Sequence, residues 1–306
     1  MIRRLPCIIL ACLALGFRPA GGPQTTHGRT AMPDQTADVL QTSDNPQALA
    51  SAACALAKSE RPEDHQRLLN LLRSPSFLGR LDSEQDYAKP SDKLRLWRVL
   101  KFLADNRAPS AHQVLAQLAA HPAFTENWSR ADLLIMAAPS VRPLPPALVK
   151  FLDDHCQPGD GFMNLTIESL AANGSPPAVQ LLEKKLTAPG FEDDDKIAWM
   201  HGAIHAHRND APLLEVCERI LAGERLPANL RPVLVESLFD HRQEEWYGPD
   251  NLYPLPPLER ASPEARRRLR TIGQHALAKV PLDARQKKAV EDTLKRLDEL
   301  EGKITP

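Results

Sequence analysis

Apolar residues recur along most of this chain with the spacing of an amphipathic α-helix, and the helical stretches come in pairs. Residues 161–190 show one pair, GFMNLTIESLAANG followed by SPPAVQLLEKKLTAPG. The Asn-Gly step at 173–174 is expected to end the first helix, because both residues tolerate the left-handed cap conformation. Ser175 is expected to cap the second helix and the Pro-Pro step at 176–177 to open it.

The pairs recur with a period of 34 residues. Prolines at this spacing, Pro109, Pro143 and Pro177, are expected in the first turn of each second helix, where the missing N–H of proline had no partner. Several other series of residues keep the same 34-residue spacing, and each such series is called a column. Because several columns keep this spacing together, we infer a structural repeat. Two columns of the first helix, apolar except for Lys196, are Phe102, Met136, Leu170, Ile204 and Leu238 and, earlier in the helix, Leu94, Trp128, Phe162, Lys196 and Leu230.

A single pair cannot cover its own apolar faces and must stack on its neighbours. The predicted fold is therefore all-α, an α-solenoid (superhelix) of about five to six antiparallel helical pairs with a C-terminal helical cap. The two cap helices are expected at 262–279 and 283–300. The chain is divided into a signal peptide (1–16), a flexible linker (17–43), helical repeats (44–240), a loop rich in proline and aromatic residues (241–261) and the C-terminal cap helices (262–306).

The unit at 170–186, LAANGSPPAVQLLEKKL, resembles HEAT-like repeats, in which an Ala- and Leu-rich helix, a turn of small residues and a Leu-rich helix recur. The resemblance covers residues 46–240 and implies a protein-binding scaffold, although a minority of such stacks carry enzyme activity. Tetratricopeptide repeats have a similar length, but their small-residue columns are missing here. Thr166, Met200 and Leu234 share a column that no small residue occupies.

The first residues have the form of a bacterial export signal. Arginines at 3–4 precede an apolar run over 5–17, which is shorter than the roughly 20 residues that span a bilayer. We therefore expect an exported protein, periplasmic or secreted. A buried N-terminal helix is one alternative. The other is a lipoprotein signal, because the residues at 9–12 resemble a lipobox, and lipidation of Cys12 would anchor the protein to a membrane.

Composition and charge exclude several classes of function. The chain is 42% hydrophobic and 25% charged, which excludes wholesale disorder. Its net charge of −1 argues against nucleic acid as a partner, because phosphate binding needs a basic excess. No phosphate-binding glycine loop, nucleophile elbow or paired-cysteine motif is present, so no cofactor is expected. The basic run at 266–270 is interpreted as a solvated helix face.

His201 and His205 are four residues apart and so lie on one face of a helix, as in many metal sites. Two ligands do not make a site, and at most one of Glu168 and Glu236, one unit to either side, could join them. His201 also stands in an otherwise apolar column, which favours a core histidine held by a hydrogen bond. The alternative is a metal-dependent enzyme with its site at these histidines in the concave face.

The loop at 241–261 departs most from the repeat. It contains Trp246, Tyr247 and Tyr253, and Trp and Tyr dominate binding hot spots. Such a loop can bind a partner, or it can fold back and plug the end of the stack. We expect a non-enzymatic protein–protein interaction scaffold whose partner is another protein, bound by this loop or by the surface of the second helices.

Overall fold

The computed structural model describes residues 39–82, 94–240 and 255–302. Within these ranges every regular element is a helix, so the prediction of an all-α protein is confirmed. The described helices are short or amphipathic, and none of them combines the length and the hydropathy needed to cross a membrane.

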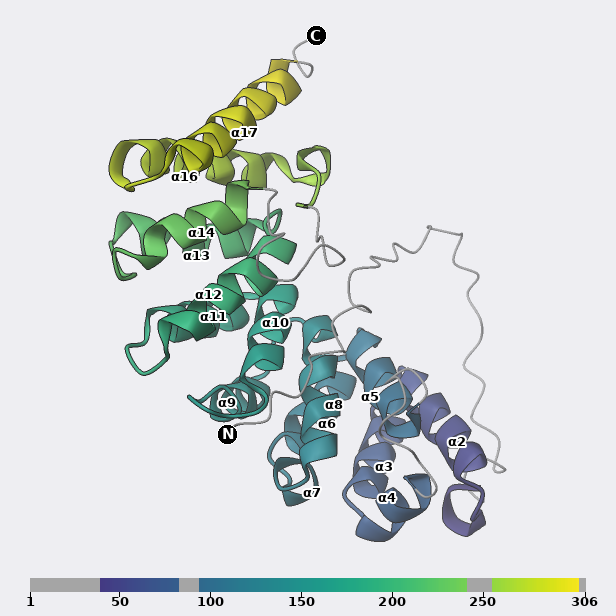
Figure 1. Ribbon diagram of the computed structural model, residues 1–306. Coiled ribbons are helices and arrows are strands. Elements are labelled where there is room, and N and C mark those ends of the chain that lie inside the picture. Colours follow the sequence, from purple (N-terminus) through teal and green to yellow (C-terminus); the bar gives the residue numbers. More distant parts are fainter. Residues whose placement is uncertain (1–38, 83–93, 241–254, 303–306) are drawn as a thin grey trace.

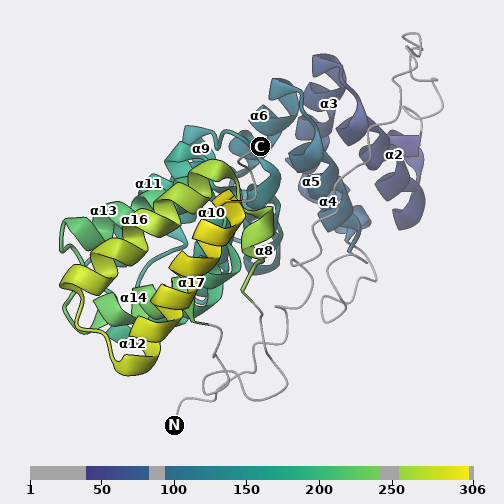
Figure 2. The same cartoon turned by 90° about the horizontal axis from the view of Figure 1, so that it is seen from above.

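The long helices lie in two rows, and each helix packs against the next helix of its own row (Figures 1 and 2). The first row consists of α2 (Pro46–Lys58), α5 (Arg95–Asp105), α8 (Trp128–Ala137), α10 (Met163–Asn173), α12 (Asp193–Trp199) with the π-helical η3 (Met200–Ile204), α14 (Leu230–Phe239) and α17 (Ala284–Gly302). The second row consists of α3 (Pro62–Leu72), α6 (Pro109–Leu118), α9 (Pro146–Asp154), α11 (Pro176–Thr187), α13 (Ala211–Ala222) and α16 (Pro263–Lys279). The shorter elements are α4 (Pro75–Leu81), α7 (Pro122–Thr125), η2 (Ala138–Ser140) and η4 (Leu258–Arg260).

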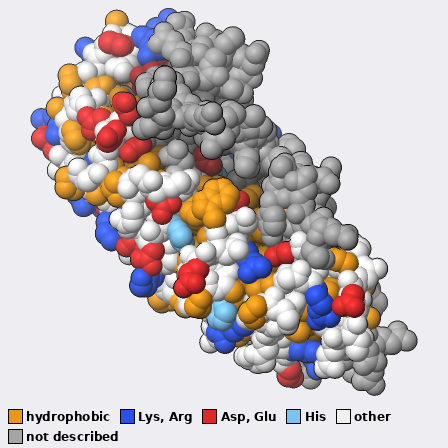
Figure 3. Space-filling view, turned by 60° about the horizontal axis from the view of Figure 1, so that its bottom comes forward, with side chains coloured by type: hydrophobic (Ala, Val, Ile, Leu, Met, Phe, Trp, Pro, Cys, Tyr) orange, Lys and Arg blue, Asp and Glu red, His pale blue; other side chains and the backbone are white. Residues whose placement is uncertain are grey.

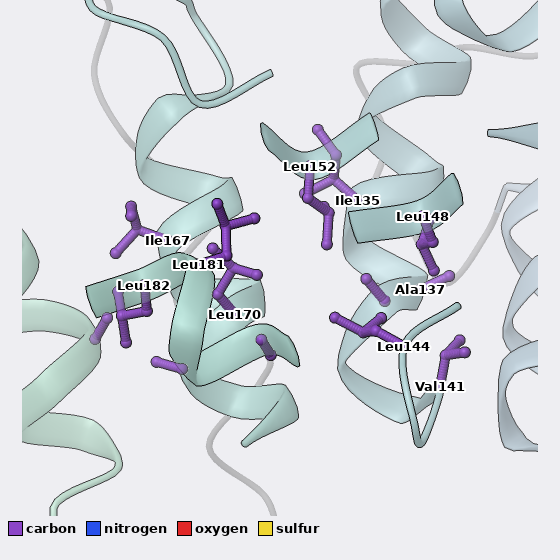
Figure 4. Packing of buried hydrophobic residues seen from close by; sticks show 14 of the residues in the cluster. Ile135, Ala137, Val141, Leu144, Leu148, Leu152, Ile167, Leu170, Leu181 and Leu182 are labelled. Atoms are coloured by element: carbon purple, nitrogen blue, oxygen red, sulfur yellow. The ribbon is translucent and has the colours of Figure 1, made fainter. Parts of the chain in front are cut away.

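The core is the seam between the two rows. Figure 4 shows apolar side chains of α8 and α10 in the first row close to those of α9 and α11 in the second. Ile135 and Ile167 of the first row are fully buried, as is Leu148 of the second. Each such side chain contributes roughly 1.5–3 kcal/mol relative to an exposed one, so the seam supplies the main force that joins the rows.

Each helix of the second row has a proline in its first turn. Pro109 and Pro177 lie there as predicted, but the prediction for Pro143 is wrong. Pro143 follows a cis peptide bond, and α9 begins only at Pro146. A proline disfavours helical backbone in the preceding residue. Pro145 is accordingly extended, with ψ 149°, and the helix cannot begin before it.

The turn between α10 and α11 follows the sequence at one cap and departs from it at the other. Gly174 ends α10 in the left-handed region (φ 63°), and its N–H donates to the Leu170 carbonyl, as predicted. Ser175 precedes α11, but its hydroxyl makes no capping hydrogen bond. An N-cap side chain accepts from the N–H of the second or the third residue of the helix. The second residue of α11 is Pro177, which has no N–H, so only one of these two donors is present.

One predicted boundary needs correction. The linker predicted over 17–43 is too long, because residues 39–42 are helical and Leu40 is fully buried. The Arg80 guanidinium of α4 fixes this segment by donating to the carbonyls of Leu40 (3.2 Å) and Ser43 (2.9 Å). At the other end of the repeats, residues 255–261 of the predicted loop pack onto the core, with Leu258 buried in η4.

The C-terminal helices α16 and α17 coincide with the two predicted at 262–279 and 283–300. The basic run on α16 is only in part the solvated face that was expected, because Arg267 is exposed but two of its neighbours are paired. The Arg268 guanidinium lies 2.8 Å from Glu215 and 3.1 Å from Glu218, both on α13. The Arg270 guanidinium lies 2.8 Å from Asp298 of α17. These arginines join α16 to its neighbours.

Side-chain hydrogen bonds also link successive helices of the first row. Ser169 of α10 is buried, and its hydroxyl donates to the Ile135 carbonyl of α8 at 2.9 Å. The usual helical donor to that carbonyl would come from Pro139, which has no N–H. The Ala138 N–H donates to the same carbonyl, and the serine supplies a second donor in place of the one that Pro139 lacks.

Replacing Ser169 with Ala is expected to lower the free energy of unfolding by about 1 kcal/mol, the usual net contribution of such a bond. Urea unfolding followed by circular dichroism measures the change. Ser140→Ala, at an exposed serine of η2, is the matched control and is expected to have almost no effect. Equal midpoints for the two variants would contradict the prediction.

Candidate functional site

Several residues singled out by the sequence lie outside the described ranges. These are Cys12 and the aromatic residues Trp246, Tyr247 and Tyr253. The two residues that flank the 241–254 segment are described, and both Asp240 and Leu255 are buried. The residues on either side of this segment are therefore anchored in the body of the protein.

A pocket of about 460 Å³ lies at this attachment point, between the end of α14, residues 255–259 and α17. Its innermost charge is Arg208, only 2% exposed, which donates to the carbonyls of Leu238 and Pro256, both at 2.9 Å. Burial lowers the Arg208 pKa to about 10, against a smaller opposing effect of Glu259. At the mouth Arg285 lies 2.6 Å from Glu236, so the charges here serve to hold the C-terminal helices.

His201 and His205 are both buried on the row of first helices, as expected for core histidines. The Nδ1 of His205 lies 3.1 Å from the Ser237 carbonyl and must donate to it, because a carbonyl only accepts. Burial lowers the pKa of His201, with Glu236 opposing and Arg285 reinforcing the shift. Nowhere in the described part of the chain do three or more His, Cys, Asp or Glu residues form a group that could hold a metal ion.

The outer surface of the second row carries charges that are already paired between neighbouring helices. Lys184 of α11 lies 2.8 Å from Asp153 of α9. Glu183 of α11 accepts from Arg219 of α13 at 2.6 Å and from Arg225. Each exposed pair contributes little to stability, but together they bridge one helix to the next. These charged groups are therefore already committed to contacts within the protein.

The first row differs, because it exposes a large aromatic side chain. Trp128, the first residue of α8, is 66% exposed, and no other large hydrophobic residue in the described ranges is classed as exposed. Its indole ring stacks on Phe162 at 4.9 Å between centroids and an interplanar angle of 26°. Figure 3 shows an apolar patch in the middle of the molecule, with charged side chains around it. An indole with one ring face covered and the rest in solvent is a preformed contact surface.

The support beneath Trp128 is fixed by further contacts. Phe162 is buried and meets the edge of His155 at 5.2 Å, and His155 in turn meets Phe151 at 4.5 Å. The start of α8 is held by Arg130, which lies 3.1 Å from Asp82. The indole ring is therefore placed by rigid neighbours and needs little reorganisation to meet a partner.

Two carboxyl groups lie on the partly exposed side of α8 and α10. Asp132 is one helical turn from Trp128 on the same face of α8, and Glu168 is on the solvent side of α10. Burial raises the pKa of Asp132 to about 6 and that of Glu168 to about 7, the latter against the charge of His207. Partly buried Met136 and Leu165 complete what we call the Trp128 surface: Trp128, Asp132, Met136, Leu165 and Glu168.

The sequence pattern placed Trp128 in an apolar column of the first helix and so missed its exposure. The same column contains Lys196, which is buried and donates to the Ala188 carbonyl at 2.6 Å. Leu94, Phe162 and Leu230 of this column are buried as well, so Trp128 is the exception. Its exposure therefore had no sign in the sequence.

Comparisons with protein-family models, with curated proteins and with solved structures found no match to this chain.

Proposed function

We propose that this protein is an α-solenoid scaffold of HEAT-like helical pairs that binds another protein through the Trp128 surface. The packing of each helix on the next member of its row, together with the recurring hydrophobic columns, supports a stacked repeat. The apolar run at 5–17 supports export to the bacterial envelope or the medium as its place of action.

The observation that carries the proposed site is the exposure of Trp128 on a fixed aromatic support. Exposing an indole to water forgoes part of its burial energy. Trp is also among the residue types most enriched at binding hot spots. Truncating such an anchor in an interface costs about 2 kcal/mol or more of binding energy. This assignment moves the binding surface from the second helices, where the charges are paired internally, to the first.

The test is an affinity pull-down from the cell envelope with the chain from residue 17 onward. Trp128→Ala is expected to lose the partner, whereas Gln180→Ala, at an exposed residue of α11, is expected to keep it. A Trp246→Ala/Tyr247→Ala double variant tests the competing loop site. A partner that is lost only in the loop variant would refute the role of the Trp128 surface.

A further inference from the structure

In the described part of the chain, several partly buried carboxylates form an ion pair with a neighbouring cation. Asp82 faces Arg130 at 3.1 Å, Glu183 faces Arg219 at 2.6 Å, and Glu236 faces Arg285 at 2.6 Å. The arrangement is expected, because a carboxylate that loses water without gaining a partner is costly.

Asp132 and Glu168 depart from this pattern. Neither carboxyl group forms an ion pair or a hydrogen bond with any residue in the described ranges. The one charge that acts on Glu168 is that of His207, and His207 is itself paired with Asp210 at 3.3 Å. Both carboxyl groups are thus partly desolvated and uncompensated.

Asp132 lies on the same helix as the exposed indole, and Glu168 lies on the helix that packs against it. Trp128 and Asp132 are four residues apart on α8, so their side chains project from the same face. The helix α8 packs against α10, which contributes Glu168. Met136 and Leu165 are partly buried on these two helices and add apolar surface to them.

We propose that the partner of the Trp128 surface is a protein segment that combines lysine or arginine with apolar side chains. This inference rests on the proposed binding function and adds the chemistry of the partner. A cation from such a segment would give Asp132 and Glu168 the ion pairs that they lack in the free protein. The indole ring attracts a cation over its face as well as apolar groups, by about 0.5–2 kcal/mol for the cation.

An acidic or neutral partner fits the same surface less well. An acidic segment would bring like charges against two carboxylates, which costs binding energy at the point of contact. A wholly apolar segment would bury both carboxyl groups still further without pairing them. The unpaired carboxyl groups therefore favour a partner segment with positive charge. The indole and the apolar residues around it favour a segment that also has apolar side chains.

The experiment is a selection of displayed random peptides of about 12 residues on the immobilised full chain. The enriched peptides are expected to combine Lys or Arg with aromatic or aliphatic residues. Their affinity, measured by fluorescence anisotropy, is expected to fall by about tenfold or more for Asp132→Asn/Glu168→Gln, because two close ion pairs are lost. Both substitutions remove uncompensated charge, so the double variant is expected to fold.

The matched control is Glu60→Gln/Glu291→Gln, which changes the net charge equally at two exposed residues. Its affinity is expected to change by no more than about twofold. Enriched peptides without excess positive charge, or equal affinities for the two double variants, would overturn the cationic partner. If Trp128→Ala alone abolishes binding, the binding function stands and only the partner's charge is wrong. If Trp128→Ala leaves every peptide bound, the binding site itself is wrong.

Discussion

Changing Asn173 to Ala is expected to lower the free energy of unfolding by about 3 kcal/mol. Asn173 is fully buried at the end of α10, and its amide donates to the carbonyls of Ala138 (2.8 Å) and Val141 (2.7 Å) in the preceding unit. Its side-chain oxygen accepts from the Ser175 N–H. The substitution leaves the Val141 carbonyl and the Ser175 N–H without this partner, whereas the Ala138 carbonyl still accepts from the Val141 N–H at 3.1 Å. Unpaired buried polar groups cost about 1–3 kcal/mol each.

Chemical unfolding monitored by circular dichroism measures this loss. Asn173→Asp retains the shape but replaces two N–H donors with an acceptor that faces two carbonyl oxygens, so it is expected to destabilise the protein at neutral pH at least as much. Gln180→Ala, on the exposed side of α11, is the control. If Asn173→Ala matches this control within about 0.5 kcal/mol, the hydrogen bonds between units do not hold the stack together.

Changing Glu168 to Gln is expected to stabilise the protein by on the order of 2 kcal/mol at pH 8. Burial raises the Glu168 pKa in the folded state to about 7, from its ordinary value of 4.5. Between these two values the folded state binds more protons than the unfolded chain, so stability falls as the pH rises through this window. Glutamine lacks this titration, and its advantage should vanish below pH 4.5.

The check is a series of thermal or urea unfolding curves from pH 4 to pH 8 for the wild type and the variant. Asp132→Asn is expected to behave in the same way over a lower window, because burial raises its pKa from 3.8 to about 6. Glu291→Gln removes an exposed carboxylate and serves as the control. A stability difference that does not change with pH would contradict the assigned titration.

The fold could be predicted well wherever local chemistry decides the structure. The stop at Gly174 depends on a backbone conformation that glycine adopts freely, and the long cap helices α16 and α17 have strong amphipathic patterns. The prediction failed at Pro143, where constant spacing was assumed. There the consecutive prolines at 145–146 impose their own backbone restrictions and shift the start of α9.

The candidate site could not be predicted in the same way, because it depends on contacts between distant residues. The exposure of Trp128 is set by its stacking on Phe162, a whole unit away in the chain. Likewise, Arg268 pairs with Glu215 and Glu218 of α13 as well as with Glu264 of its own helix. Only the pair with Glu264 follows from the spacing in the sequence. A linear pattern reports which residues share a helix face, but not what the neighbouring helix places against it.

The most direct test of the central claim is site-specific photo-cross-linking in cells that produce the protein. A benzophenone amino acid is placed either at Glu126, an exposed residue just before Trp128, or at Gln180 on the second row, so that the indole itself is kept. We expect a discrete protein adduct from position 126 and none from position 180. An adduct from position 180 alone, or no adduct from position 126, would contradict the proposed binding site.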